Sequence, residues 1–148
     1  MDLYAENILD HYRSPRGTEP VEKPSVEHQE VNASCGDELT IQLKIEDEKI
    51  TGLSWKGTGC AISQAAMSML SEEILNSLSR EATAGAQWNQ FSILNSFTPK
   101  NIYDLLGVPI GPRRFKCALL CLHALKNALR LYEKKEPQSW IETVGVER

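Results

Sequence analysis

The sequence lacks several features that mark whole classes of protein. No run of apolar residues approaches the roughly 20 needed to span a bilayer, and the N-terminus has no basic region followed by an apolar segment. We therefore expect a cytoplasmic protein with no membrane partner. Because 16 basic residues stand against 20 acidic ones, giving a net charge of −4, we expect no nucleic-acid partner either. Repeats and low-complexity tracts are also absent.

The length and composition predict one folded domain. A chain of 148 residues, of which 41% are hydrophobic and 24% charged, can bury a core of its own but is short for two domains. We place the domain at residues 1–136. Residues 137–148 form a C-terminal tail with a few apolar side chains among polar ones, so the tail either docks on the domain or is mobile.

The cysteines are few and widely spaced. They are Cys35, Cys60, Cys117 and Cys121, and gaps of 25 and 57 residues between the first three leave no local C-x-x-C motif. In a reducing compartment such residues are thiols or metal ligands rather than disulfides. Any metal site must therefore be assembled by the tertiary fold. Cys121 lies in an apolar run, and we expect it to be a small buried side chain.

Apolar alternation predicts a strand over residues 37–45. Leucine and isoleucine occupy every second position there, with polar residues between them. Cys35 and Asp37 continue the same alternation, so their side chains should project from the apolar face, just beyond the end of the core. After a polar turn, residues 50–55 complete a hairpin, and residues 26–31 are predicted to form an edge strand.

Apolar residues at intervals of three and four predict helices after the strands. One helix begins at or near Cys60. The clearest runs from Arg113 to about Lys135 and has Cys117 in its first turns. Shorter helices are predicted near residues 1–12 and 98–106, and a weaker helical pattern covers residues 79–95.

The two helices that carry Cys60 and Cys117 suggest how a site could form. Unpaired amide groups and the positive end of the helix dipole favour a thiolate over a thiol at a helix N-terminus. If both helices pack on the apolar face of the sheet, their N-termini can converge beside Cys35 and Asp37. Three sulfurs and one oxygen would then make a four-coordinate shell for a metal ion.

Three segments around these residues carry a specific pattern. They are Ser34-Cys35-Gly36-Asp37, Gly57-Thr58-Gly59-Cys60-Ala61-Ile62-Ser63 and Arg113-Arg114-Phe115-Lys116-Cys117. In order and context they closely resemble the IscU/NifU-N family of iron–sulfur assembly proteins, and the resemblance extends over residues 1–135.

Two departures make the resemblance strongest for the SufU branch. Lys116 stands where scaffold members carry a histidine, and a protonated ammonium cannot ligate a metal. Scaffold members also carry a Leu-Pro-Pro-Val-Lys chaperone-docking motif where this chain has Ile110-Gly111-Pro112-Arg113-Arg114. The long gap between Cys60 and Cys117 is likewise similar to that of SufU proteins.

The resemblance implies an α+β fold and a function. The fold is a small antiparallel three-stranded sheet with helices packed on one face, and the metal site lies at the sheet end and the helix N-termini. The implied function is that of a zinc-bearing sulfur acceptor, a sulfurtransferase-type relay partner of a SufS-type cysteine desulfurase rather than a stand-alone enzyme. A downstream iron–sulfur scaffold is the implied next partner. The zinc ligands carried over are Cys35, Asp37, Cys60 and Cys117, with Cys35 also the sulfur-accepting, catalytic thiolate.

Other interpretations stay open at this point. The same cysteines could hold iron in a [2Fe–2S] cluster on an assembly scaffold. The protein could also be a structural zinc module whose metal supports only the fold and whose surface binds a partner. The positive charges of Arg113, Arg114 and Lys116 either attract a partner or form a solvated helix start.

Overall fold

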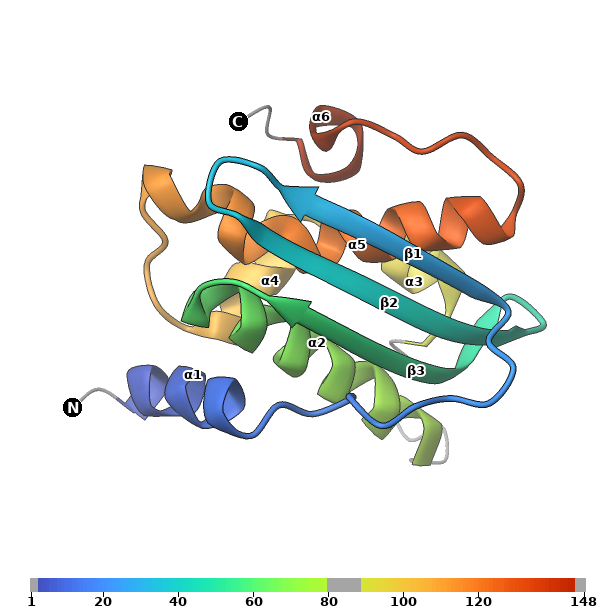
Figure 1. Ribbon diagram of the computed structural model, residues 1–148, viewed down its shortest axis with the longest axis horizontal. Helices are drawn as coiled ribbons and strands as arrows, with labels where there is room; N and C mark the ends of the chain where they lie inside the picture. The colour runs from blue at the N-terminus through green and yellow to red at the C-terminus, as the bar shows by residue number, and fades with distance from the viewer. Residues whose placement is uncertain (1–2, 80–88, 146–148) are drawn as a thin grey trace.

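The computed structural model describes residues 3–79 and 89–145, which form an antiparallel sheet covered by helices on one face (Figure 1). The sheet has three strands in the spatial order β1-β2-β3. Their bounds are β1 Val26–Asn32, β2 Asp37–Glu46 and β3 Lys49–Thr58. The predicted α+β class, with a three-stranded antiparallel sheet and helices packed on one face, is confirmed.

The helices come before and after the sheet in the chain, and α2 and α5 lie behind it in Figure 1. The first, α1, is anchored on α2 because buried His11 lies 2.7 Å from the Ser68 hydroxyl. The helices are α1 Leu3–Arg13, α2 Ala61–Ser79, α3 Phe91–Asn95, α4 Pro99–Leu106, the 3-10 turn η1 Pro112–Arg114, α5 Phe115–Tyr132 and α6 Trp140–Val144.

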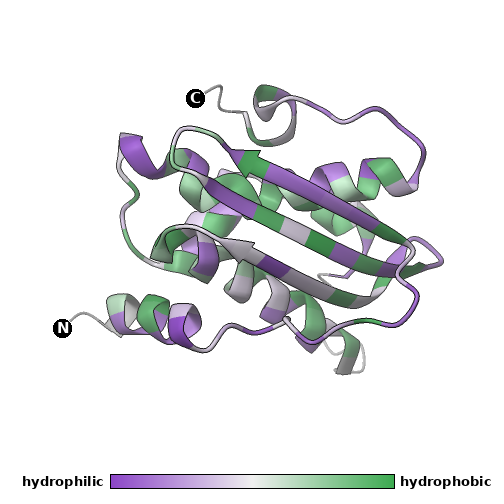
Figure 2. Cartoon of the chain, in the orientation of Figure 1, coloured by the Kyte–Doolittle hydropathy of each residue, from purple (hydrophilic) through white to green (hydrophobic). Residues whose placement is uncertain are grey.

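The alternation of β2 gives the sheet one buried face and one half-buried, polar face. Leu39, Ile41 and Leu43 are completely buried, while the polar residues between them lie on the other face. Figure 2 shows the same alternation of hydrophobic and hydrophilic residues along this strand. The apolar face packs against α2 and α5, so the starts of both helices can approach the end of the sheet where β2 begins.

Two predicted helices differ from the structure. The helix predicted from Arg113 starts with the single 3-10 turn η1, because Pro112 can begin a helix, and α5 then ends at Tyr132. Of the helix predicted at 79–95, residues 80–88 lie outside the described residues. Asn89 and Gln90 are not helical, because their backbone pairs with the β2–β3 hairpin, where the Ile50 amide donates to the Asn89 carbonyl at 2.8 Å.

The C-terminal segment is docked as far as it is described. Residues 140–144 form α6, whose Thr143 and Val144 are buried. The serine before it, Ser139, caps the helix together with Glu142 in a capping box. None of the helices within residues 3–79 and 89–145 is both long enough and apolar enough to cross a bilayer.

Candidate metal centre

Asp37 is the first residue of β2 and lies opposite Asn32, the last residue of β1. Its side chain is completely buried. Oδ1 accepts hydrogen bonds from the Cys60 amide at 2.9 Å and the Ser63 hydroxyl at 3.4 Å, and Oδ2 accepts one from the Asn32 side-chain amide at 3.2 Å. All three donors are neutral. Within the described part of the chain, no lysine, arginine or histidine forms an ion pair with this carboxylate.

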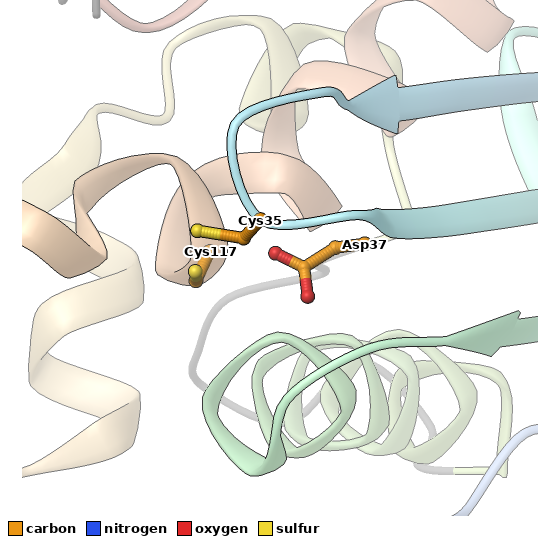
Figure 3. Close-up of side chains that lie close together, drawn as sticks. All are labelled: Cys35, Asp37 and Cys117. Atoms are coloured by element: carbon orange, nitrogen blue, oxygen red, sulfur yellow. The ribbon is translucent and has the colours of Figure 1, made fainter.

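Two cysteine sulfurs lie beside the carboxylate, as Figure 3 shows. Cys35 is in the turn between β1 and β2 and is exposed, whereas Cys117 is in the first turn of α5 and is only 1% exposed. The Sγ atoms of both cysteines and one oxygen of Asp37 all lie within 4.8 Å of one another. Three of the four predicted ligands are therefore brought together by two separate parts of the fold, the start of β2 with the turn before it and the start of α5.

Cys60, the fourth predicted ligand, borders this group. It is the residue immediately before α2 and is half-buried. Its amide bonds to Asp37, but its sulfur is not among the ligand atoms that lie within 4.8 Å of one another. The Cys60 thiol nevertheless acts on Cys117, since it is one of the groups that raise the pKa of that thiol. Cys60 thus lies at the centre's edge.

The surroundings of Cys117 oppose a bare thiolate at that residue. Burial raises the pKa of the Cys117 thiol far above its usual value, and contacts with Asp37, Cys35 and Cys60 raise it further. A bound cation would reverse this effect, because coordination to a cation stabilises a thiolate. The thiolate form of Cys117 is therefore favoured only when a cation is bound beside its sulfur.

The donor set fits a divalent metal ion that binds sulfur. A fully buried carboxylate with only neutral donors needs a positive charge to compensate its own. In addition, the buried Oδ1 of Asn32 has no hydrogen-bond partner among the described residues. Zinc binds thiolates and carboxylates, and iron also binds thiolates. The donors suit either metal.

A glycine makes room for the carboxylate. Gly59 has a φ of +149°, and a Cβ built at this position would overlap Oδ1 of Asp37 and lie 2.8 Å from the Ser63 hydroxyl. Any side chain here would push Asp37 away from the Cys60 amide. The turn before α2 is therefore built around the carboxylate.

A cavity of about 580 Å³ opens beside Cys35. Two of the three predicted partner-binding residues, Arg113 and Lys116, line it, whereas Arg114 is exposed at the end of η1 and does not. Exposed Cys35 therefore faces a space bordered by two positive charges. The lining residues are Asn32, Ser34, Cys35, Pro112, Arg113, Phe115 and Lys116.

Sequence reasoning missed two residues that hold the carboxylate. Asn32 donates to Asp37 and its side-chain nitrogen also lies 3.9 Å from the Cys117 sulfur. Ser63 donates to the other carboxylate oxygen. A signal for Asn32 was present, because a four-residue turn between antiparallel strands pairs residue 32 with residue 37.

Cys121 is one turn beyond Cys117 on α5 and plays no part in the centre. It is completely buried, and its sulfur lies 3.5 Å from the Ala118 carbonyl. Burial raises the pKa of this thiol to about 12, so it stays protonated at neutral pH. The prediction that it is a small buried side chain is confirmed.

Two curated proteins are similar to this chain over most of their lengths. An "Iron-sulfur cluster assembly scaffold protein IscU" of Thermotoga maritima is 33% identical over 135 residues, which cover 86% of this chain and 93% of that protein. A "Zinc-dependent sulfurtransferase SufU" of Bacillus subtilis is 30% identical and covers 86% of this chain and 89% of its own length.

A solved structure has the same fold. It is a putative iron–sulfur cluster assembly scaffold protein for the SUF system from Fervidobacterium islandicum, with a TM-score of 0.53 and 26% identity over 84% of this chain and 94% of that one. The model of the NifU-like N-terminal domain family matches residues 3–139. This match spans nearly the whole chain, and the chain therefore belongs to the family of NifU-like N-terminal domains.

Proposed function

We propose that this protein is a zinc-dependent sulfur acceptor in iron–sulfur cluster biogenesis, and that Cys35 takes persulfide sulfur from a SufS-type cysteine desulfurase. One observation carries the proposal: Cys35 is exposed at the mouth of a cavity, whereas the other two members of the group, Asp37 and Cys117, are buried. A partner protein can therefore reach only one of these three groups.

The metal would be held by Cys35, Asp37 and Cys117, with Cys60 as the fourth ligand at their edge. Zinc would keep the sulfurs in thiolate form without redox chemistry of its own. Asn32 and Ser63 orient the Asp37 carboxylate, and the Cys60 amide fixes it from the start of α2.

Sulfur transfer would proceed by thiol exchange. The Cys35 thiolate attacks the terminal sulfur of the partner's cysteine persulfide, and a new S–S bond forms on Cys35 as the S–S bond of the partner breaks. The partner's cysteine leaves as a thiolate, so no outside oxidant or reductant is needed. Arg113 and Lys116 border the cavity and favour the approach of the negatively charged persulfide. A downstream iron–sulfur scaffold would then receive the sulfur.

The test is to map persulfide by mass spectrometry after incubation with the desulfurase and cysteine. We expect persulfide on the peptide that contains Cys35, and none in a Cys35→Ser variant, which should also fail to stimulate desulfurase turnover. Cys121→Ser is the matched control, because that buried cysteine should not affect the transfer. Persulfide that accumulates equally in Cys35→Ser would refute the proposal.

A [2Fe–2S] scaffold is the second candidate, because the same three cysteines suit iron and the Thermotoga maritima relative is named as a scaffold. Lys116 beside Cys117 counts against it, since an ammonium cannot replace the histidine of scaffold members. Metal analysis of anaerobically purified protein separates the two, because a cluster brings iron and visible absorption and zinc brings neither. A purely structural zinc module would leave Cys35 unreactive, and its exposure argues against that.

A further inference from the structure

The C-terminal helix α6 contacts a side chain of the candidate site. The Lys116 ammonium lies over the ring of Trp140, 5.2 Å from its centroid. Lys116 also lines the cavity beside Cys35 and immediately precedes Cys117. Trp140 therefore contacts one of the two cationic side chains that border the cavity, although the proposed sulfur transfer does not use it.

Trp140 is itself held in place by α5. The His123 ring stacks on it, with centroids 4.2 Å apart and an angle of 19° between the planes. The edge of that histidine ring is also held, because its Nδ1 lies 2.7 Å from the Thr143 hydroxyl. Thr143 and His123 are both only 3% exposed. The indole therefore rests on a buried support.

Further hydrogen bonds dock the segment that carries Trp140. The Lys126 ammonium donates to the Thr143 carbonyl at 2.9 Å. Just before α6, the Gln138 amide donates to the side-chain oxygen of Asn127 at 2.8 Å, and the side-chain nitrogen of Asn127 donates to the Gln138 carbonyl at 3.0 Å. These hydrogen bonds fix the position of the segment relative to α5, and they fix the position of Trp140 with it.

An aromatic ring restricts the positions of a lysine ammonium beside a cavity. The flexible four-carbon stem of lysine allows the ammonium many positions, most of them in solvent. Contact with an aromatic face favours those in which the ammonium stays near the ring. Among the described residues that line the cavity, Lys116 and Arg113 are charged and none is acidic, so the position of the Lys116 ammonium contributes directly to the electrostatic potential in the cavity.

We propose that Trp140 is a positioning residue that holds the Lys116 ammonium at the cavity beside Cys35, so that Cys35 reacts preferentially with anionic sulfur species. The inference rests on the proposed role of Cys35 as sulfur acceptor, because a persulfide is such a species at neutral pH. The C-terminal segment that carries Trp140 would thereby contribute to the reactivity of Cys35.

The test compares two alkylating reagents that differ mainly in charge. Iodoacetate is anionic and iodoacetamide neutral, and with both a bond forms between Cys35 and carbon while iodide leaves. Mass spectrometry of the Cys35 peptide gives both rates, and their ratio measures the preference for an anion. Each ratio is taken on one preparation of the full chain with measured metal content, so that differences in Cys35 reactivity as such cancel.

We expect Lys116→Gln to lower the ratio about threefold to fivefold, as loss of one nearby charge predicts. Trp140→Leu should lower it nearly as much, and Trp140→Phe, which keeps an aromatic face, by less. Combining Trp140→Leu with Lys116→Gln should add nothing to Lys116→Gln alone. Ile141→Ala is the matched control, because Ile141 lies on the same helix and is 53% exposed, and the ratio should not change.

Two results would overturn the inference: an unchanged ratio in Lys116→Gln and an unchanged ratio in Trp140→Leu. If Trp140→Leu slows both reagents equally, the ratio is unchanged and Trp140 has a structural role only. Thermal unfolding of each variant identifies any that fail to fold, and Trp140→Phe then decides. Alkylation needs no desulfurase, so a failure of persulfide transfer with the ratios as expected would refute the proposed function and not the positioning role of Trp140.

Discussion

Two carboxylates near the same end of the sheet, Glu30 and Asp37, have opposite surroundings. Glu30 is on β1 and its side chain is 18% exposed. It accepts hydrogen bonds from His28 Nε2 and Asn127 Nδ2, both at 2.8 Å, and lies 3.4 Å from His123 Nε2. Burial acts to raise the pKa of Glu30, but these contacts outweigh it and hold the pKa well below its usual value.

Asp37 is more deeply buried and has weaker partners. It is completely buried, yet its donors are a backbone amide, a side-chain amide and a hydroxyl, and its other close neighbours are sulfurs. The chain itself surrounds Glu30 with two histidine rings and an amide, whereas Asp37 has only neutral donors and is a candidate partner for a bound cation. The difference supports a structural role for Glu30, which connects β1 to α5, and the proposed role of Asp37 as a metal ligand.

The largest expected effect is on metal affinity. Asp37→Ala removes a proposed ligand and should weaken zinc binding by roughly 100-fold or more. Glu30→Gln should leave it unchanged within about twofold, because Glu30 is not among the clustered ligand atoms. Competition with a chromophoric chelator measures both. Similar losses in the two variants would remove the distinction between the carboxylates.

Stability should show the reverse pattern. Glu30→Gln should lower the free energy of unfolding at pH 7 by about 2 kcal/mol, because two histidines and an amide lose a charged partner. Since the folded-state pKa of Glu30 lies below its usual value of 4.5, its contribution is complete above that pH and is lost as the pH falls below it. Urea unfolding at pH 7 and pH 3.5 should therefore show the difference from the unmodified chain shrinking in acid. A pH-independent difference would contradict the electrostatic explanation.

The two asparagines that serve the carboxylates provide a finer test. Asn32→Ala should weaken zinc binding about 10-fold, because Asn32 orients Asp37 and lies near Cys117. Asn127→Ala is the counterpart at Glu30 and should affect only stability. The same chelator competition serves as readout, and an equal effect of both variants on affinity would show that Asn32 is no more than a structural residue.

The smallest effect is expected at Cys121. Among the described residues its buried thiol is not part of the cluster of possible metal ligands, so Cys121→Ala should leave the metal content unchanged and lower the free energy of unfolding by about 1 kcal/mol through a small cavity. Elemental analysis and urea unfolding test the two statements. A loss of metal would place Cys121 in the site.

Local patterns of the sequence predict the frame of the site well. The alternation of β2 correctly predicts that Asp37 lies on the buried face, but Cys35, for which it predicts the same face, lies in the turn before the strand and is exposed. The helical spacing predicts that Cys60 and Cys117 lie at helix starts. Both patterns depend on a period of a few residues. The fold as a whole and the proposed set of four ligands are predicted only by the resemblance of the motifs to a family.

What the sequence does not predict depends on contacts between distant segments. Asn32 becomes a partner of Asp37 only through the register of β1 with β2. The docking of α6 depends on His123 and Thr143 meeting, and a helix of five residues has no periodicity to reveal it. The non-helical Asn89 and Gln90 follow from bonds to a hairpin that precedes them by forty residues in the chain.

The central claim, that Asp37 and three cysteines share one metal ion, is tested most directly by X-ray absorption spectroscopy at the zinc edge of the purified protein. We predict a shell of three sulfurs at about 2.3 Å and one oxygen at about 2.0–2.2 Å, with the oxygen lost or replaced in Asp37→Ala. A shell of four sulfurs, or a spectrum that Asp37→Ala leaves unchanged, would contradict the account.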